Sequence, residues 1–142
     1  MKLFTTTFLL IAASFMVQAQ DFTDYQWESR ILLLVDPIPE SAAMRAQLVA
    51  FLETPEEMKE RDLLLFRVTA DNVLDKNGKP TGVSRHSVYK DYALSKQFQG
   101  ILLIGKDGGV KLKENFFVKP SIIFSLIDGM PMRRAEMRSK KG

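Results

Sequence analysis

Apolar residues gather in short runs that are bounded by charged residues, glycine or proline. Runs of consecutive aliphatic residues without polar alternation are typical of strands that are buried on both faces of a sheet. We therefore predict strands over residues 31–35, 63–69 and 101–104. Residues 110–113 alternate between apolar and lysine positions, which predicts a half-exposed fourth strand. The Asp-Gly-Gly step within 105–109 favours a β-hairpin between the last two strands.

Helical periodicity fills most of the chain between these strands. A helix is expected from about Glu40, because Met44, Leu48 and Phe51 recur at helical spacing. Thr54 and the proline after it are typical of a helix start, so a second helix is expected to run from there to residues 60–61.

Two further helices are expected, over 85–98 and 120–129. The segment 70–85 is rich in turn residues and is expected to be a loop. The Met-Pro-Met step at 130–132 is expected to end the last helix, and the basic residues beyond it read as a frayed tail.

The resulting order is β-α-β-α-β-β-α, with two strands joined through a helix and followed by a hairpin. Because the connection between two parallel strands is almost always right-handed, few other arrangements of these elements in space are possible. We predict an α/β, thioredoxin-like fold with a mixed four-stranded sheet flanked by helices. It forms a single domain over 20–138, and a basic tail occupies 139–142.

The first nineteen residues have the pattern of a signal peptide. One lysine precedes an apolar run, and Val17-Gln18-Ala19 places small residues at the two positions that signal peptidase reads. A membrane anchor is the alternative, but the run is shorter than the ~20 residues that span a bilayer. We expect cleavage after Ala19, no membrane span afterwards, and export to the periplasm or the cell exterior.

Composition excludes several kinds of chemistry. The 142 residues contain no cysteine and one histidine, His86, which excludes thiol nucleophiles, disulfides and thiolate metal sites. The formal net charge is +3 and falls to +2 if Lys2 is lost with the signal peptide, so a nucleic-acid partner is not expected. Nothing in the sequence indicates a cofactor.

Four stretches together resemble an uncharacterised family, the domain of unknown function 4174. They are Trp27 with Arg30, Glu60-Arg61-Asp62, the hairpin residues 104–111, and residues 127–137. The family is similar to the P-DUDES domains of extracellular animal proteins, which implies a thioredoxin- or peroxiredoxin-like fold and export. It has no established activity and therefore implies no reaction.

The sequence departs from working thioredoxins where their chemistry occurs. Residues 36–41 stand where the redox Cys-x-x-Cys would follow the first strand. Phe98-Gln99-Gly100 occupies the place of the proline that usually precedes the first hairpin strand. Thiol–disulfide exchange is excluded because no thiol is present.

In a thioredoxin-like topology the first two strands run in the same direction and the first hairpin strand runs in the opposite direction. Charged residues from distant segments are therefore expected to converge at the hairpin end of the sheet. They are Arg30, Arg61, Asp62, Lys106, Asp107, Asp128, Arg133, Arg134 and Glu136. Two interpretations remain open. The cluster forms a lattice of ion pairs that holds the elements together, or it is a recognition surface for an anionic group or a partner protein.

We therefore predict a non-catalytic binding or interaction module whose partner is an unknown protein or a small anionic ligand. The alternative is an enzyme of thiol-independent chemistry that uses the Asp and Arg residues of this end. A minor third hypothesis is a metal site formed by Met130, Met132 and His86. The sequence does not indicate the oligomeric state.

Overall fold

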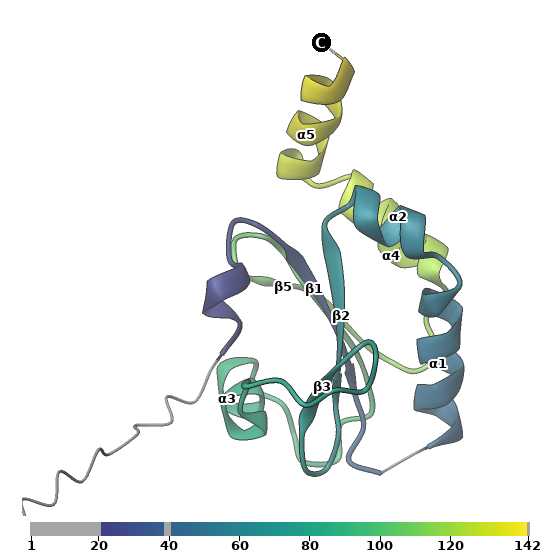
Figure 1. Cartoon of the computed structure of the whole chain (residues 1–142), viewed down its shortest axis with the longest axis vertical. Coiled ribbons are helices and arrows are strands. Elements are labelled where there is room, and N and C mark those ends of the chain that lie inside the picture. Colours follow the sequence, from purple (N-terminus) through teal and green to yellow (C-terminus); the bar gives the residue numbers. More distant parts are fainter. Residues whose placement is uncertain (1–20, 39–40, 142) are drawn as a thin grey trace, which may run out of the picture.

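A five-stranded sheet lies at the centre of the computed structural model, which describes residues 21–38 and 41–141 (Figure 1). Its strands are β1 (Arg30–Val35), β2 (Leu63–Val68), β3 (Val73–Asp75), β4 (Gly100–Ile104) and β5 (Val110–Asn115), in the spatial order β3-β2-β1-β4-β5. β1 pairs in parallel with β2 and antiparallel with β4. The directions that the sequence predicted for these three strands are confirmed.

Helices cover both faces of the sheet. One face carries α1 (Ala42–Leu52), α2 (Pro55–Glu60) and α4 (Pro120–Asp128), and the other carries the 3-10 helix η1 (Phe22–Tyr25) and α3 (Arg85–Asp91) (Figure 1). The C-terminal helix α5 (Pro131–Lys141) follows α4 and projects away from the sheet (Figure 1).

The central strands are buried on both faces, as their unbroken aliphatic runs predicted. Alternate β1 side chains enter two separate cores, with Leu33 packing on the α3 side and Leu32 on the α1 and α4 side. Every residue of β1 and β4 is buried, whereas β5 lies at the sheet edge and is mostly exposed. The α/β class of the fold is confirmed, with five strands instead of the expected four.

The additional strand, β3, lies inside the segment that was expected to be a loop. Val73 is 1% exposed and pairs with Val68, so burial of one valine outweighs the turn-forming composition around it. α3 is also shorter than predicted. It ends at Asp91, and Ala93 then adopts the left-handed conformation (φ 52°) that is common just beyond helix ends.

The basic segment at the C-terminus is helical up to Lys141, which corrects the expectation of a frayed tail. Pro131 lies in the first turn of α5, where a missing N–H costs nothing, so the Met-Pro-Met step separates two helices. Arg133 and Glu136 in the first half of α5 are held by the rest of the domain, as described below.

α1 buries a polar side chain and exposes an apolar one. Gln47 is fully buried, whereas Leu52 is 45% exposed. The Gln47 amide donates to the carbonyl of Val118 and accepts from its N–H, both at 2.8 Å. This side chain satisfies a buried segment of backbone that no strand covers.

The predicted signal peptide, residues 1–19, lies outside the described residues. Within the described part of the chain, no helix is both long enough and apolar enough to cross a membrane.

Candidate functional site

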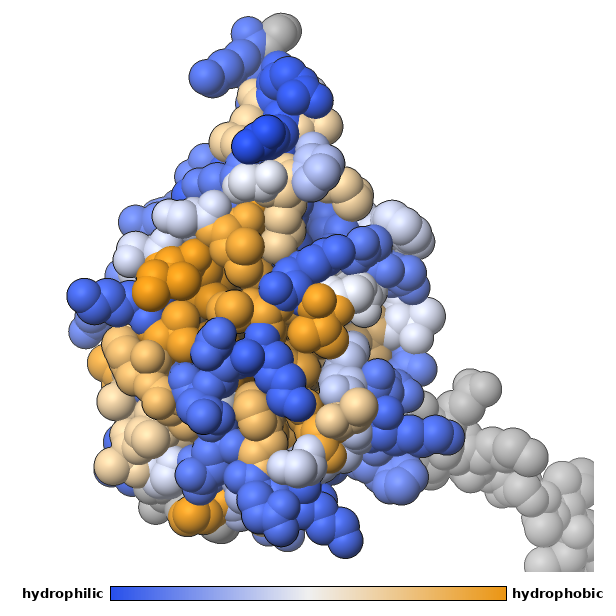
Figure 2. All heavy atoms as spheres, turned by 180° about the vertical axis from the view of Figure 1, so that it is seen from behind, coloured by the Kyte–Doolittle hydropathy of each residue, from blue (hydrophilic) through white to orange (hydrophobic). Residues whose placement is uncertain are grey.

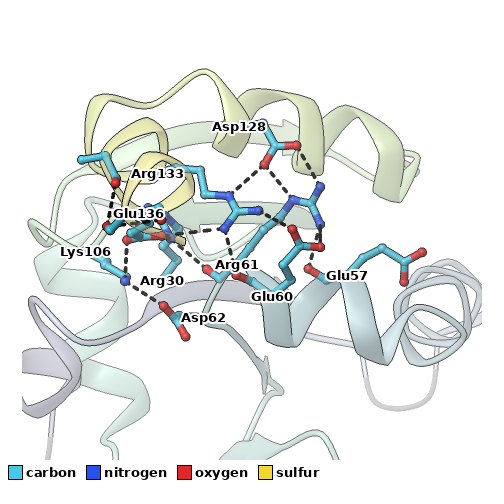
Figure 3. A network of polar contacts seen from close by, with 11 residues as sticks. Arg30, Glu57, Glu60, Arg61, Asp62, Lys106, Asp128, Arg133 and Glu136 are labelled. Carbon is cyan, nitrogen blue, oxygen red and sulfur yellow. Dashed lines mark hydrogen bonds and ion pairs between the residues drawn. The ribbon is translucent and has the colours of Figure 1, made fainter. Parts of the chain in front are cut away.

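Seven of the nine charged residues singled out in the sequence meet at one end of the sheet (Figure 3). They are joined by Glu60, and we call the eight side chains the charged network. Its cations are Arg30, Arg61, Lys106 and Arg133, and its carboxylates are Glu60, Asp62, Asp128 and Glu136.

Strand direction explains why residues so distant in sequence meet. Arg30 begins β1 opposite Leu63 of the parallel strand β2, so the segment 60–62 lies at the same end. β4 runs the opposite way, and Ile104 at its end pairs with Ile31 near the start of β1. The hairpin residue Lys106 therefore lies at this end as well, and Asp128 at the end of α4 meets Arg61 there (Figure 3).

Arg30 is 1% exposed and faces the carboxylate of Glu136 with both terminal nitrogens. Its NH1 and NH2 each lie 3.2 Å from a Glu136 oxygen, and NH1 also donates to the carbonyl of Arg61 at 2.9 Å. The planar guanidinium thus binds a helix at the C-terminus to the start of the first two strands.

Arg133 is also 1% exposed, and it reaches the body of the domain from α5. Its Nε donates to Asp128 at 3.0 Å, and its NH1 and NH2 donate to the carbonyl and the carboxylate of Glu60 at 2.9 Å. One side chain therefore connects α5 to the end of α4 and the end of α2.

Arg61 approaches Asp128 from the opposite side. Its Nε and NH2 lie 3.0 and 2.8 Å from the two oxygens of Asp128, and NH1 donates to the carbonyl of Glu57. Its guanidinium carbon lies 4.8 Å from the centre of the Phe124 ring. The side chain is thus fixed by a fork-shaped ion pair and by an aromatic face.

Lys106 is 8% exposed and completes the network at the hairpin. Its Nζ lies 2.8 Å from Asp62 and 2.6 Å from Glu136. Asp62 adopts a left-handed backbone conformation with a φ of 49°, in the short turn that connects α2 to β2. The ion pair ties that turn to the hairpin.

The ion pairs govern the protonation of the network. Burial acts to raise the pKa of Glu136 and of Asp128, but hydrogen bonds from the facing cations outweigh it, and both pKa values are lowered. Burial likewise acts to lower the pKa of Lys106, and the hydrogen bonds to Asp62 and Glu136 raise it overall. All three groups are therefore held in their charged forms.

The network contains equal numbers of cations and carboxylates, and every member pairs with at least one other member. Three cavities among the described residues, of about 200, 500 and 470 Å³, are lined by other side chains. This arrangement matches a lattice of ion pairs better than a receptor for an anion, because its cations already have carboxylate partners. A binding role for these residues stays a prediction.

Two of the predicted residues lie outside the network. Asp107 pairs with Lys111 within the hairpin at 2.8 Å, and Arg134 is exposed on α5. Glu60 was not among the predicted site residues, although it precedes Arg61 and Asp62 directly. Its role depends on the position of α5, a segment whose basic residues were expected to form a frayed tail.

The opposite end of the sheet, where a thioredoxin places its redox cysteines, carries a buried carboxylate. Asp36 follows β1 and is 1% exposed. It accepts hydrogen bonds from the Ile38 N–H at 2.8 Å, from the Gln99 amide at 3.3 Å and from the Ser41 hydroxyl. Ser41 in turn accepts from the Met44 N–H and caps α1. Asp36 thus links the end of β1 to Ile38 and to Ser41, the residue that caps α1.

The hypothesis of a metal site formed by His86 and the C-terminal methionines is not supported. His86 lies on α3, whereas Met130 packs into the core on the other face of the sheet. Among residues 21–38 and 41–141, no group of three or more His, Cys, Asp or Glu side chains is arranged to hold a metal ion.

Comparisons with solved structures agree with this architecture. The reduced 2-Cys peroxiredoxin of Plasmodium vivax superposes with a TM-score of 0.58 and 19% identity, over 80% of this chain and 71% of that chain. Thioredoxin peroxidase I of Plasmodium yoelii gives a TM-score of 0.55 and 17% identity, over 79% and 78%. At such identities the likeness shows the thioredoxin-like fold and nothing about activity.

Sequence comparisons point to an uncharacterised family. Coiled-coil domain-containing protein 80 of Danio rerio is 27% identical over 133 residues, which cover 80% of this chain but 15% of that protein. The model of the family described as Domain of unknown function (DUF4174) matches residues 21–136. The chain therefore belongs to the DUF4174 family.

Proposed function

We propose that the protein is an exported, non-catalytic binding module built on a thioredoxin-like scaffold. The observation that carries the proposal is the buried carboxylate of Asp36, directly after β1. Asp36, in the region where thioredoxins place their redox cysteines, is 1% exposed and engaged with Ile38, Ser41 and Gln99. A buried carboxylate held by three hydrogen-bond donors has a structural task and is closed to a substrate.

The charged network supports the same proposal. An enzyme at the hairpin end would need a carboxylate free to exchange a proton, yet Asp128 and Glu136 have lowered pKa values. General acids and bases need pKa values near the working pH. The alternative of thiol-independent catalysis by these Asp and Arg residues is therefore not favoured.

Export rests on the N-terminal segment of the sequence. One lysine, an apolar run and a small-residue cleavage site precede a domain that contains no cysteine. A domain of this size can bury a sufficient core without disulfides, and in this one the fully buried strand β1 lies between two apolar cores and contributes to both.

One preparation of the immobilised chain tests the proposal in two ways, by capture of a partner and by turnover of a small molecule. The chain is immobilised, exposed to the secreted and cell-envelope fractions of its host, and washed at increasing salt. A partner retained in saturable, stoichiometric amounts and eluted chemically unchanged supports a binding module. A small molecule consumed by the immobilised chain, with no retained partner, would contradict it.

The same experiment with Asp36→Ala addresses the turn after β1. If the variant stays folded, it should still bind its partner, because the Asp36 side chain is buried and cannot contact a partner. The N-terminal sequence of the exported protein, read by mass spectrometry, tests the cleavage site. A start at Gln20 agrees with export by signal peptidase, and a retained Met1 contradicts it.

A further inference from the structure

The positive charge of this protein is concentrated in α5. The whole chain carries 20 Lys and Arg residues and 17 Asp and Glu residues. α5 holds five of the basic residues and one of the acidic residues, which leaves 15 basic and 16 acidic residues in the rest of the chain. The domain body is therefore nearly neutral, and its last helix is a cationic projection.

The two sides of α5 have different tasks. Arg133 and Glu136 point to the body and are engaged in the charged network. Arg134, Arg138 and Lys141 are exposed. Their spacing of four and three residues places them within about 60° of one another around the helix, on the side opposite Glu136. We call these three residues the basic ridge.

The basic ridge has no ion-pair partner among the described residues, unlike Arg133 in the same helix. Figure 1 shows α5 extending beyond the other elements, and Figure 2 shows hydrophilic side chains along this projection. Basic residues in the last turn also complement the helix dipole, but the dipole does not require that they form one row. The network holds the helix in a fixed direction, so the row is presented on a defined axis.

The chemistry of the basic ridge indicates its partner. The row is about 10 Å long, and the carboxylates of a facing acidic helix repeat at about 6 Å along one side. An arginine fork pairs in a two-point geometry with a carboxylate, as Arg61 does with Asp128 in this protein. A helix that enters a lipid surface needs a broad apolar face with several large residues. The ridge is flanked by Ala135 and Ser139 on one side and by one large apolar residue, Met137, on the other.

We propose that the basic ridge of α5 docks an acidic, helical segment of a partner protein. This inference rests on the proposed function, because it names the surface and the partner chemistry of the binding module. The charged network acts as the anchor that orients the ridge, and the ridge itself forms the contact.

The test uses the full chain and a synthetic alanine-rich helical peptide with Glu at i, i+4 and i+7, labelled for fluorescence anisotropy. A peptide of the same composition with its Glu residues distributed around the helix is the comparator. The chain should bind the one-sided peptide at least about fivefold more tightly, and binding should weaken as salt is raised. Equal binding of the two peptides would overturn the proposal that the basic ridge recognises the acidic face of a helix.

The informative variant is Arg134→Glu/Arg138→Glu/Lys141→Glu, which reverses the ridge. It should weaken peptide binding about tenfold or more and leave the melting temperature close to that of the unmodified chain.

The matched control is Lys76→Glu/Lys79→Glu/Lys96→Glu. It produces the same change in net charge at exposed positions away from α5 and should alter binding less than about twofold. Equal weakening by both triple variants would overturn the proposal, because net charge would then explain the binding.

Binding of the full chain is also measured with two other anionic probes, vesicles of phosphatidylglycerol and a sulfated polysaccharide. Binding of either one in preference to the one-sided peptide would overturn the assignment to an acidic protein segment. If the ridge variant keeps the partner that capture retains, this inference fails while the proposed binding module stands. If capture retains nothing, the proposed function fails as well.

Discussion

Arg30 and Glu136 are separated by 106 positions in the sequence, and in the structure each terminal nitrogen of the guanidinium lies 3.2 Å from a carboxylate oxygen. Arg30 is 1% exposed and the Glu136 side chain 23%. Pairs that are largely removed from water hold their elements together strongly once formed, because separating the partners leaves a charge without solvent. This pair connects the first strand to the last helix.

Removal of the Glu136 charge should therefore destabilise the domain. We expect Glu136→Gln to lower the free energy of unfolding by about 2–4 kcal/mol, since Arg30 and Lys106 both lose an ionic partner. Urea denaturation measures the change. Glu114→Gln, at an exposed position on β5, is the control and should change stability by less than about 0.5 kcal/mol. Equal effects would show that the pair contributes nothing specific.

Arg61 separates the two interpretations of the charged network. Arg61→Ala should lower the free energy of unfolding by about 2–4 kcal/mol, because Asp128 loses a two-point partner and Phe124 loses a cation on its ring. Arg61→Lys should recover only part of the loss, since an ammonium cannot form the fork. Thermal melts check both variants. An unchanged melt combined with lost partner binding would favour a recognition surface.

The lowered pKa values of Asp128 and Glu136 predict acid sensitivity. A carboxyl whose folded pKa lies below its unfolded value stabilises the domain above the unfolded pKa, ordinarily 3.8 for Asp and 4.5 for Glu. The contribution is lost as the pH falls from about 4.5 through the folded values. Melting temperatures between pH 7 and pH 3 should show this decline.

Asp128→Asn/Glu136→Gln provides the check on that decline. The double variant should start from a lower melting temperature at pH 7 and fall less steeply on acidification, because two of the titrating groups are gone. A decline as steep as that of the unmodified chain would assign the acid sensitivity to other carboxylates.

Asp36 is expected to act through structure. Asp36→Ala should lower the free energy of unfolding by about 1–3 kcal/mol, because Ile38, Ser41 and Gln99 each lose an acceptor. Chemical denaturation measures the loss, with Asp71→Ala at an exposed position as the control. A stability equal to that of the control variant would mean that the turn after β1 does not depend on this carboxylate.

The aliphatic runs determined the sheet without help from the tertiary structure. Five successive buried residues in β1 exclude an exposed face, and the Asp-Gly-Gly step determined the hairpin. Strand directions followed from the thioredoxin-like order of the elements, so the convergence of Arg30, Asp62 and Lys106 at one end could be predicted. These signals are local, and nearby residues are sufficient to specify them.

Tertiary contacts decided the remaining features. β3 forms because Val73 finds a partner in Val68, and Gln47 is buried because a backbone segment 71 positions away needs its amide. α5 is a helix in a fixed position because Arg133 and Glu136 find Glu60 and Arg30, a match that composition cannot reveal in a basic segment. Long-range pairing of buried polar groups has no local sequence signature, and that is the physical reason why folding, and not the sequence pattern, specified the direction in which the basic ridge points.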